Sequence, residues 1–153
     1  MVLQNESFPP VSLENLLPHR VVYKTGENGY SYKTDESGRI SNASTKELQS
    51  KTHEDRLPHN PKTPGKLAGD HAGHLFGDRF GGSPELDNLV SQTSKVNLSE
   101  YKKIENIWAK AIKDGKKVAV DIKINYPSGG SRPSSFEIEY TIDGIPSYEK
   151  IYN

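Results

Sequence analysis

Alternating apolar and polar positions in the N-terminal third of the chain predict a small antiparallel meander. Val21-Val22-Tyr23 and Tyr30–Thr34 contain the β-branched and aromatic residues that are enriched in strands. Between them lies Glu27-Asn28-Gly29, and an Asn-Gly pair suits the positive φ angles of a type I′ hairpin turn. Ser37-Gly38 predicts a second turn, which leads into a third strand at Arg39-Ile40-Ser41.

The second half of the chain changes from helical to strand periodicity. Residues 118–124 and 136–142 alternate apolar and polar positions and predict two strands, which a loop at 127–130 separates. A helix is predicted from an N-cap at Ser99 to a C-terminal stop at Asp114-Gly115. Together these elements predict an α+β fold with an antiparallel sheet and one principal helix. The apolar positions of the helix follow i, i+3, i+4, i+7 spacing and are Tyr101, Ile104, Ile107, Trp108, Ala111 and Ile112.

Two segments have no clear period. Residues 1–20 contain several prolines and are interpreted as an extended arm or a linker remnant, with the domain itself at residues 21–153. Residues 43–72 are poor in large apolar groups and are expected to be irregular, apart from one helical turn at 45–49. A loop of this length inside a small domain is often functional.

Composition and charge exclude several classes of protein. The chain has 153 residues and no cysteine, so thiolate metal sites and thiol nucleophiles are excluded. It has no run of about 18 apolar residues that could span a membrane, and its start lacks the basic and apolar regions of a conventional signal peptide. The net charge is +0, but residues 95–133 hold nine Lys or Arg against four Asp or Glu, a net +5. A neutral total is therefore compatible with a polyanionic partner.

Three short features could carry chemistry, and each also has an ordinary structural explanation. His71 and His74 could be zinc ligands, or solvated side chains of a turn. Gly81-Gly82-Ser83 could bring backbone N–H groups to a phosphate, or could be a flexible turn. Asn97 and Glu105 are spaced to share one stripe of a helix, but taken singly they could be a cap and a solvated charge.

Taken in order, these features form a more specific set. The set resembles the DNA/RNA non-specific endonucleases of the ββα-metal (His-Me finger) superfamily. It is most similar to the subgroup at the C-termini of secreted bacterial polymorphic toxins, including type VII-secreted LXG-type effectors. The resemblance covers about residues 20–145. Its motifs are Tyr32-Lys33-Thr34-Asp35-x-x-Gly38-Arg39-Ile40, Gly73-His74-Leu75, Phe80-Gly81-Gly82-Ser83, Asp87-Asn88-Leu89-Val90, Asn97, Glu105 and Arg132-Pro133-x-Ser135-Phe136.

The resemblance implies a role for individual residues. His74 takes the place of the general base, and Asn97 that of the only protein ligand of Mg²⁺, for which Mn²⁺ should substitute. Glu105 takes the place of the carboxylate that binds a metal-coordinated water. Asn88 corresponds to the residue that fixes the catalytic loop or the imidazole.

The chain departs from the family motif Asp-Arg-Gly-His. His71-Ala72 precede Gly73-His74, and Asp70 lies one residue too early, so either Asp70 or His71 could replace the motif Asp. The motif Arg is absent, and its contact with phosphate must pass to another residue. Arg79 is the first candidate, Lys102 is a further substrate contact, and the other candidates are Arg39, Arg56 and Arg132.

The resemblance predicts a Mg²⁺-dependent endonuclease that hydrolyses DNA with low sequence selectivity, with RNA left open as a substrate. It further implies secretion as part of a larger bacterial toxin, action in the target-cell cytoplasm and a cognate immunity protein. Three alternatives remain at this point. The first is a non-catalytic nucleic-acid-binding module, and the second is a small metal-binding structural domain that uses His71 and His74. The third is a sugar- or protein-binding β-domain in which these residues have no functional role.

Overall fold

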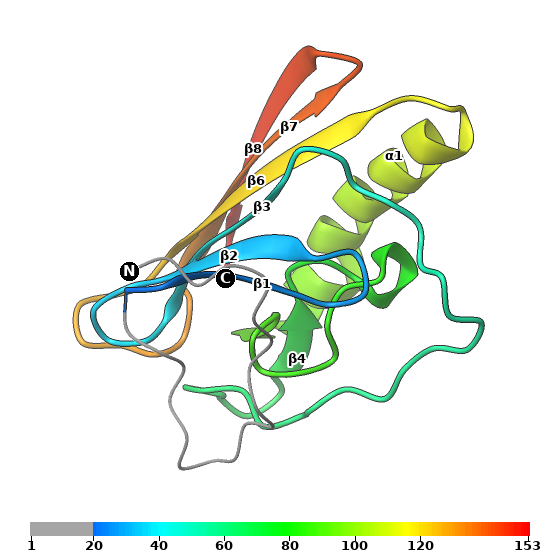
Figure 1. Ribbon diagram of the computed structural model, residues 1–153. Coiled ribbons are helices and arrows are strands. Elements are labelled where there is room, and N and C mark those ends of the chain that lie inside the picture. The colour runs from blue at the N-terminus through cyan, green and yellow to red at the C-terminus, as the bar shows by residue number, and fades with distance from the viewer. Residues whose placement is uncertain (1–19) are drawn as a thin grey trace.

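The computed structural model describes residues 20–153, and its largest element is a six-stranded antiparallel sheet (Figure 1). The strand order is β1-β2-β3-β6-β7-β8, so the N-terminal meander joins a C-terminal meander through the β3–β6 pair. The strands are β1 (Val22–Thr25), β2 (Tyr30–Thr34), β3 (Ile40–Thr45), β6 (Val118–Asn125), β7 (Ser135–Ile142) and β8 (Ile145–Tyr152).

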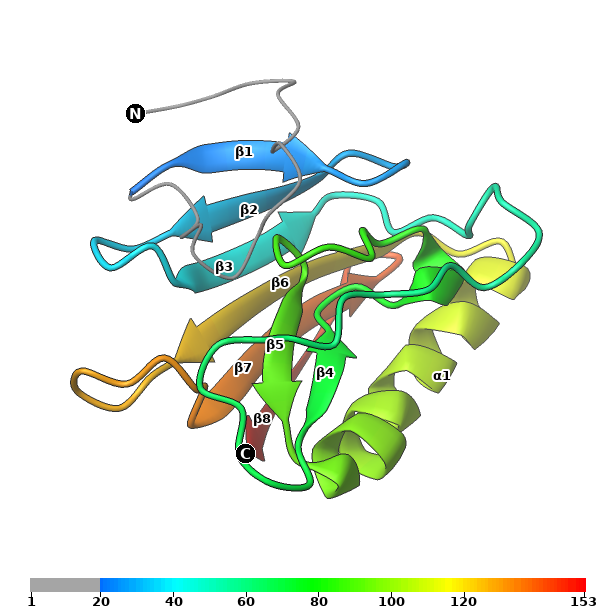
Figure 2. The ribbon, with the colours of Figure 1, turned by 90° about the horizontal axis from the view of Figure 1, so that it is seen from below.

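A second unit lies on one face of this sheet. It consists of an antiparallel pair, β4 (His71–His74) and β5 (Leu89–Gln92), followed by α1 (Tyr101–Lys113). A short 3₁₀ helix, η1 (Asp78–Phe80), lies between the two strands, and a π-helical turn, η2 (Val96–Glu100), leads into α1. In Figure 2 the β4–β5 pair and α1 lie side by side over the sheet. The chain thus contains a ββα unit packed on a larger sheet.

The core lies between the sheet and the ββα unit. Trp108 of α1 is fully buried, with its ring edge-on to Phe80 at 6.1 Å and to Tyr140 at 5.8 Å. Alternate residues of β6 and β7 point into this layer. Burial of such aromatic and aliphatic side chains is the main stabilising contribution to this arrangement.

The predicted meander, the principal helix and the two strands at 118–124 and 136–142 are confirmed, with differences in detail. The first hairpin has a four-residue loop, 26–29, in which only Gly26 and Gly29 have positive φ angles, so it is not a type I′ turn. The helical segment begins before Ser99, because the Thr93 hydroxyl accepts the Val96 N–H at 3.1 Å. Ser99 is therefore not the N-cap.

Other expectations were wrong or incomplete. Residues 45–49 form no helical turn, because Leu48 is buried against the sheet and its N–H donates to Val118 O at 2.7 Å. The pattern did not predict β4, β5 or β8. Asp143-Gly144 gave a signal for β8, since both residues have the positive φ angles of a type I′ turn. The predicted arm falls, except for Arg20, outside the described residues.

No helix within residues 20–153 has both the length and the apolar character needed to cross a membrane.

Candidate active site

A cleft of about 330 Å³ opens between β4, η1 and the N-terminal end of the helical segment. It is lined by five of the residues singled out from the sequence, which come from the four elements β4, η1, η2 and α1. The irregular segment between β3 and β4 adds Lys51 and Arg56, and η1 adds Asp78. The five are His74, Arg79, Asn97, Lys102 and Glu105.

His74, at the end of β4, is buried and neutral. Only 9% of its surface is exposed, and its ring lies edge-on to His59 with 5.0 Å between the centroids. Burial lowers the pKa of His74 to about 4, and the nearby His59 and Arg56 act in the same direction while Asp78 opposes them. Its Nε2 is buried without a hydrogen-bond partner among the described residues. The interpretation of a solvated turn histidine is therefore wrong.

Glu105 supplies a carboxylate to the same cleft from the first turns of α1. It is half-buried and makes neither a hydrogen bond nor an ion pair with any described residue. Burial raises the pKa of Glu105, and Lys102, Arg79 and Arg56 partly offset that effect. Gly77 makes room for this side chain, since a Cβ atom there would lie 2.3 Å from Glu105 Oε2. The carboxylate is thus poised for a cationic or water ligand.

Asn97 lines the cleft from η2, and its amide is held by β4. Asn97 Nδ2 lies 3.0 Å from His71 Nδ1. Because an amide nitrogen can only donate, His71 Nδ1 must be the acceptor. No residue within 20–153 donates to the Asn97 carbonyl oxygen, which is therefore open to a ligand. π-Helical turns occur often at functional sites, and here such a turn presents Asn97.

Asp70 and Arg132 contact each other away from the cleft. Arg132 donates to both carboxylate oxygens of Asp70, at 2.7 and 3.1 Å, and this pairing keeps the pKa of Asp70 below its usual value. Neither residue lines the cleft. Of the two candidates for the motif Asp, His71 is the one that contacts a cleft residue.

Asn88 fixes the loop that connects β4 to β5. It is fully buried, accepts from the Phe76 N–H at 3.0 Å, and donates to Phe76 O and Ser83 O at 2.8 and 2.9 Å. Its oxygen also accepts from the Tyr32 hydroxyl of the main sheet. Asn88 therefore fixes the loop backbone, and no contact with the imidazole is present.

The Gly81-Gly82 pair does not form a phosphate-binding nest. The N–H of Gly81 donates to Asp78 O, and that of Gly82 to Gly77 O, so both are used inside the loop. A Cβ atom at Gly82 would lie 1.8 Å from Phe76 O, which explains why glycine is required there.

The donor set of the cleft fits a hard divalent cation. The Asn97 carbonyl and the Glu105 carboxylate are oxygen ligands of the kind that Mg²⁺ prefers, and Mg²⁺ needs few protein ligands because it keeps several waters. Among residues 20–153 no group of three or more His, Cys, Asp or Glu could hold a metal ion. His71 and His74 lie three apart in a strand and so face opposite sides, which removes support for a shared zinc ion.

The fold and the cleft define an α+β nuclease with a ββα unit. The chain belongs to the DNA/RNA non-specific endonuclease family, whose profile matches residues 19–144. Family membership makes this domain an endonuclease, and so an enzyme that hydrolyses nucleic acid.

The chain is also similar to two larger proteins. It is 33% identical over 138 residues to the type VII secretion system protein EssD of Staphylococcus aureus, which covers 84% of this chain and 22% of EssD. It is 31% identical over 84 residues to the probable deoxyribonuclease RhsA of Dickeya dadantii, which covers 55% of this chain and 6% of RhsA. The chain thus spans about a fifth or less of these relatives.

The fold also matches a solved structure. The NucA of Streptococcus agalactiae superposes with a TM-score of 0.65 and 20% identity, over 81% of this chain and 70% of NucA. This likeness confirms the α+β nuclease fold.

Proposed function

We propose that this domain is a Mg²⁺-dependent endonuclease that cleaves phosphodiester bonds of DNA, and also of RNA, without sequence selectivity. The main support is the cleft itself, which is lined by a buried neutral imidazole and by an amide oxygen and a carboxylate that no described residue engages, with cationic side chains at its rim. Mn²⁺ is expected to substitute for Mg²⁺.

His74 is proposed as the general base that accepts a proton from the attacking water. A base must be unprotonated at working pH, and burial of His74 provides that state. Its Nε2 is buried, so Nδ1 is the nitrogen that can meet a water in the cleft. The family's motif carboxylate is not present beside the ring, and Asp78 is the nearby acidic group that favours the imidazolium after proton transfer.

Asn97 and Glu105 are proposed to hold the divalent ion, directly through the Asn97 oxygen and through a water at Glu105. Such an ion stabilises negative charge on the phosphate oxygens and on the leaving group. Asn97 carries no charge of its own, and His71 fixes the orientation of its amide. Gly77 keeps space beside the Glu105 carboxylate.

The cationic side chains of the rim are proposed to bind the phosphate backbone. Arg79 and Lys102 are exposed at the mouth of the cleft, and Arg79 also donates to Asn106 Oδ1 at 2.8 Å. Backbone contacts carry affinity but no sequence information. Arg132 and Asp70 pair with each other and are proposed to act only by fixing the loop that precedes β4.

A plasmid-cleavage assay with and without EDTA tests this proposal. Purified protein with Mg²⁺ should degrade plasmid DNA and RNA, and EDTA should abolish degradation. His74→Ala should lower the cleavage rate by about 10²- to 10⁴-fold, the usual contribution of a general base. Leu98→Ala is a control, since it changes an exposed apolar residue of the same cleft. Salt-sensitive DNA retention without cleavage would instead favour a binding module.

We further propose that residues 21–153 are the nuclease unit of a secreted bacterial toxin that acts in the target-cell cytoplasm, with residues 1–20 as a connecting arm. The support is the similarity to EssD, a protein named for the type VII secretion system. An immunity protein should then block the cleft. Expression of the domain should be toxic unless an acidic immunity protein, encoded beside it, is co-expressed. Harmless expression of an active enzyme would contradict the proposed toxin role.

A further inference from the structure

The segment that follows β3 is irregular but firmly anchored between Gln49 and Leu57. The Tyr30 hydroxyl donates to Phe80 O at 2.6 Å and accepts the Gln49 N–H at 3.1 Å. The Lys51 N–H donates to Arg79 O at 3.0 Å. These contacts attach the segment to Tyr30 at the start of β2 and to η1.

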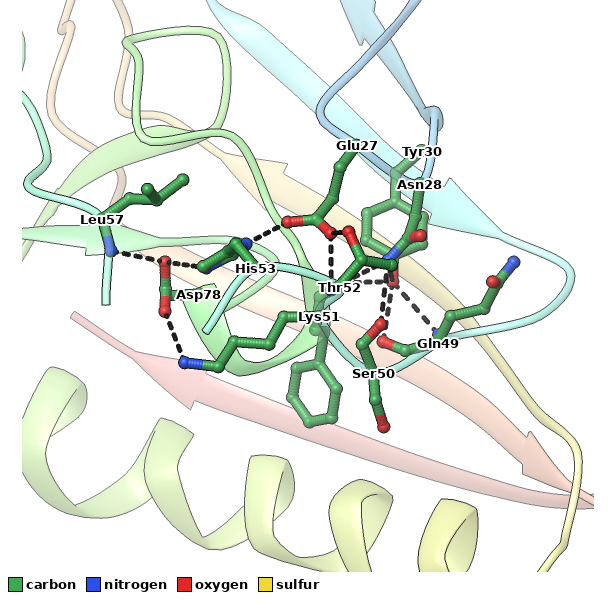
Figure 3. Close-up of polar contacts among 11 residues, drawn as sticks. Glu27, Asn28, Tyr30, Gln49, Ser50, Lys51, Thr52, His53, Leu57 and Asp78 are labelled. Carbon is green, nitrogen blue, oxygen red and sulfur yellow. Dashed lines mark hydrogen bonds and ion pairs between the residues drawn. The ribbon is translucent and has the colours of Figure 1, made fainter. Parts of the chain in front are cut away.

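His53 is the centre of this anchoring. Figure 3 shows its ring between two carboxylates, with Nδ1 at Glu27 Oε1 and Nε2 at Asp78 Oδ1, the latter at 3.0 Å. Thr52 donates to Glu27 through its N–H at 2.6 Å and also through its hydroxyl. The Leu57 N–H donates to Asp78 Oδ1 at 3.1 Å. We call Glu27, His53 and Asp78 the His53 clip.

The carboxylates of the clip are held in their charged form. Hydrogen bonds from Thr52, with a contribution from His53, lower the pKa of Glu27. Burial alone would raise the pKa of Asp78, but the Leu57 N–H, His53 and Lys51 outweigh it and keep that pKa low. Charge-assisted hydrogen bonds of this kind are stronger than neutral ones, so the clip fixes the backbone on both sides of residues 54–56.

Arg56 is the side chain that this arrangement presents to the cleft. It lines the cleft, and its charge acts on both His74 and Glu105. It makes no hydrogen bond, ion pair or ring contact with any residue in the described range 20–153. The other arginines that the sequence offered for the phosphate contact are engaged by other residues: Arg39 by Asp35 and Gly130, Arg79 by Asn106, and Arg132 by Asp70.

We propose that Arg56 contacts the scissile phosphate, and that the His53 clip positions it there. This inference rests on the proposed function. The Arg56 guanidinium lines the same cleft as the proposed base His74 and the carboxylate of Glu105, so it can offset negative charge that develops on phosphorus. The motif Arg, which Ala72 replaces in this chain, would then be substituted by a residue of a separate loop.

A double-mutant cycle tests the positioning role. Arg56→Ala should lower kcat/KM for a short DNA duplex by at least about tenfold, and Arg56→Lys should restore part of the loss. His53→Ala and Glu27→Ala should each lower kcat/KM less than Arg56→Ala does. Combined with Arg56→Ala, they should add nothing, because they act through Arg56. Lys62→Ala, an exposed cation of the same segment outside the cleft, is the matched control.

The same cycle measured as DNA affinity in EDTA separates this inference from the proposed function. If the wild-type protein binds DNA but does not cleave it, the proposed function fails, while non-additive losses of affinity would still support the role of the clip. Equal behaviour of Arg56→Ala and wild type, or additive effects of His53→Ala and Arg56→Ala, would overturn the inference. Protein that neither binds nor cleaves nucleic acid would overturn both.

Discussion

The charge state of His74 follows from where β4 places it. An exposed histidine titrates near pH 6.5, but this ring lies under the loop that carries His59, with Arg56 nearby. Loss of hydration is the main cause of the low pKa, and the cationic neighbours add to it. The same burial that keeps His74 available as a base must therefore make the fold sensitive to acid.

The free energy of unfolding should decrease as the pH is lowered from about 6.5 to about 4, because His74 is buried in its neutral form. Its pKa is about 4 in the folded state and about 6.5 in the unfolded chain. Above pH 6.5 neither state binds the proton, while between 6.5 and 4 only the unfolded chain does, so the free energy of unfolding falls as pH falls. The loss from this group approaches about 3 kcal/mol by pH 4.

Urea unfolding of the wild type and His74→Gln at pH 7 and pH 4 measures this effect. All other titrating groups are common to both proteins, so the wild type should lose about 3 kcal/mol more than the variant between the two pH values. Equal losses would show that His74 is not buried in its neutral form.

Gly77 tests the carboxylate side of the cleft. Its φ of −63° and ψ of 161° suit any residue, so Gly77→Ala should fold normally. The added Cβ would lie 2.3 Å from Glu105 Oε2 and must displace that carboxylate. Changes in groups that support a bound metal typically cost 10- to 100-fold in metal affinity or activity, and we expect a rise of about that size in the Mn²⁺ concentration for half-maximal cleavage. An unchanged Mn²⁺ requirement in a folded variant would rule out a role for the Glu105 carboxylate.

At the level of elements, the sequence predicts the parts whose burial follows a simple period. The main-sheet strands β2, β6 and β7 alternate, and α1 has a clear apolar stripe, because each buries one face only. The β4–β5 pair could not be predicted in this way, because it does not bury one face only. Every residue of β5 is buried, and β4 contains two histidines and a glycine, so neither strand shows alternation.

The candidate site likewise contains residues that the sequence could identify and others that it could not. Local spacing and the family resemblance identified the residues on β4 and the helix, which the structure brings into one cleft. Sequence could not select Arg56 over the other arginines, because its position depends on contacts across 25 or 26 residues, from His53 to Asp78 and to Glu27. The separation of Asp70 from the cleft likewise depends on its long-range pairing with Arg132.

The start of the helical segment gives a test with its own control. Thr93 caps it by accepting the Val96 N–H. Ser99, the cap expected from the sequence, lies inside the π-helical turn, and its side chain makes no hydrogen bond to any described residue. Thr93→Ala should cost about 1 kcal/mol of stability, the usual value for an N-cap, and Ser99→Ala much less. Thermal or urea unfolding measures both. A larger effect at Ser99 would contradict the observed helix start.

For the whole molecule, the net charge is neutral, but exposed cationic side chains lie on two different faces. The cleft side carries Arg79 and Lys102, which are exposed and close to the proposed base. The opposite face of the sheet carries Lys24 and Lys46, which line a separate hollow. Lys24 alternates with the buried Tyr23 and Thr25, which confirms that it points away from the core. Only the first pair should meet nucleic acid.

The salt dependence of DNA binding distinguishes the two faces. In EDTA, log K against log salt has a slope of about −0.9 for each phosphate that the protein neutralises on B-DNA. The double variant Arg79→Gln/Lys102→Gln should therefore make the slope shallower by about 2. Lys24→Gln/Lys46→Gln removes the same charge and should leave the slope unchanged. If both pairs shifted the slope equally, binding would follow total charge rather than the cleft, and the backbone-contact role of Arg79 and Lys102 would be wrong.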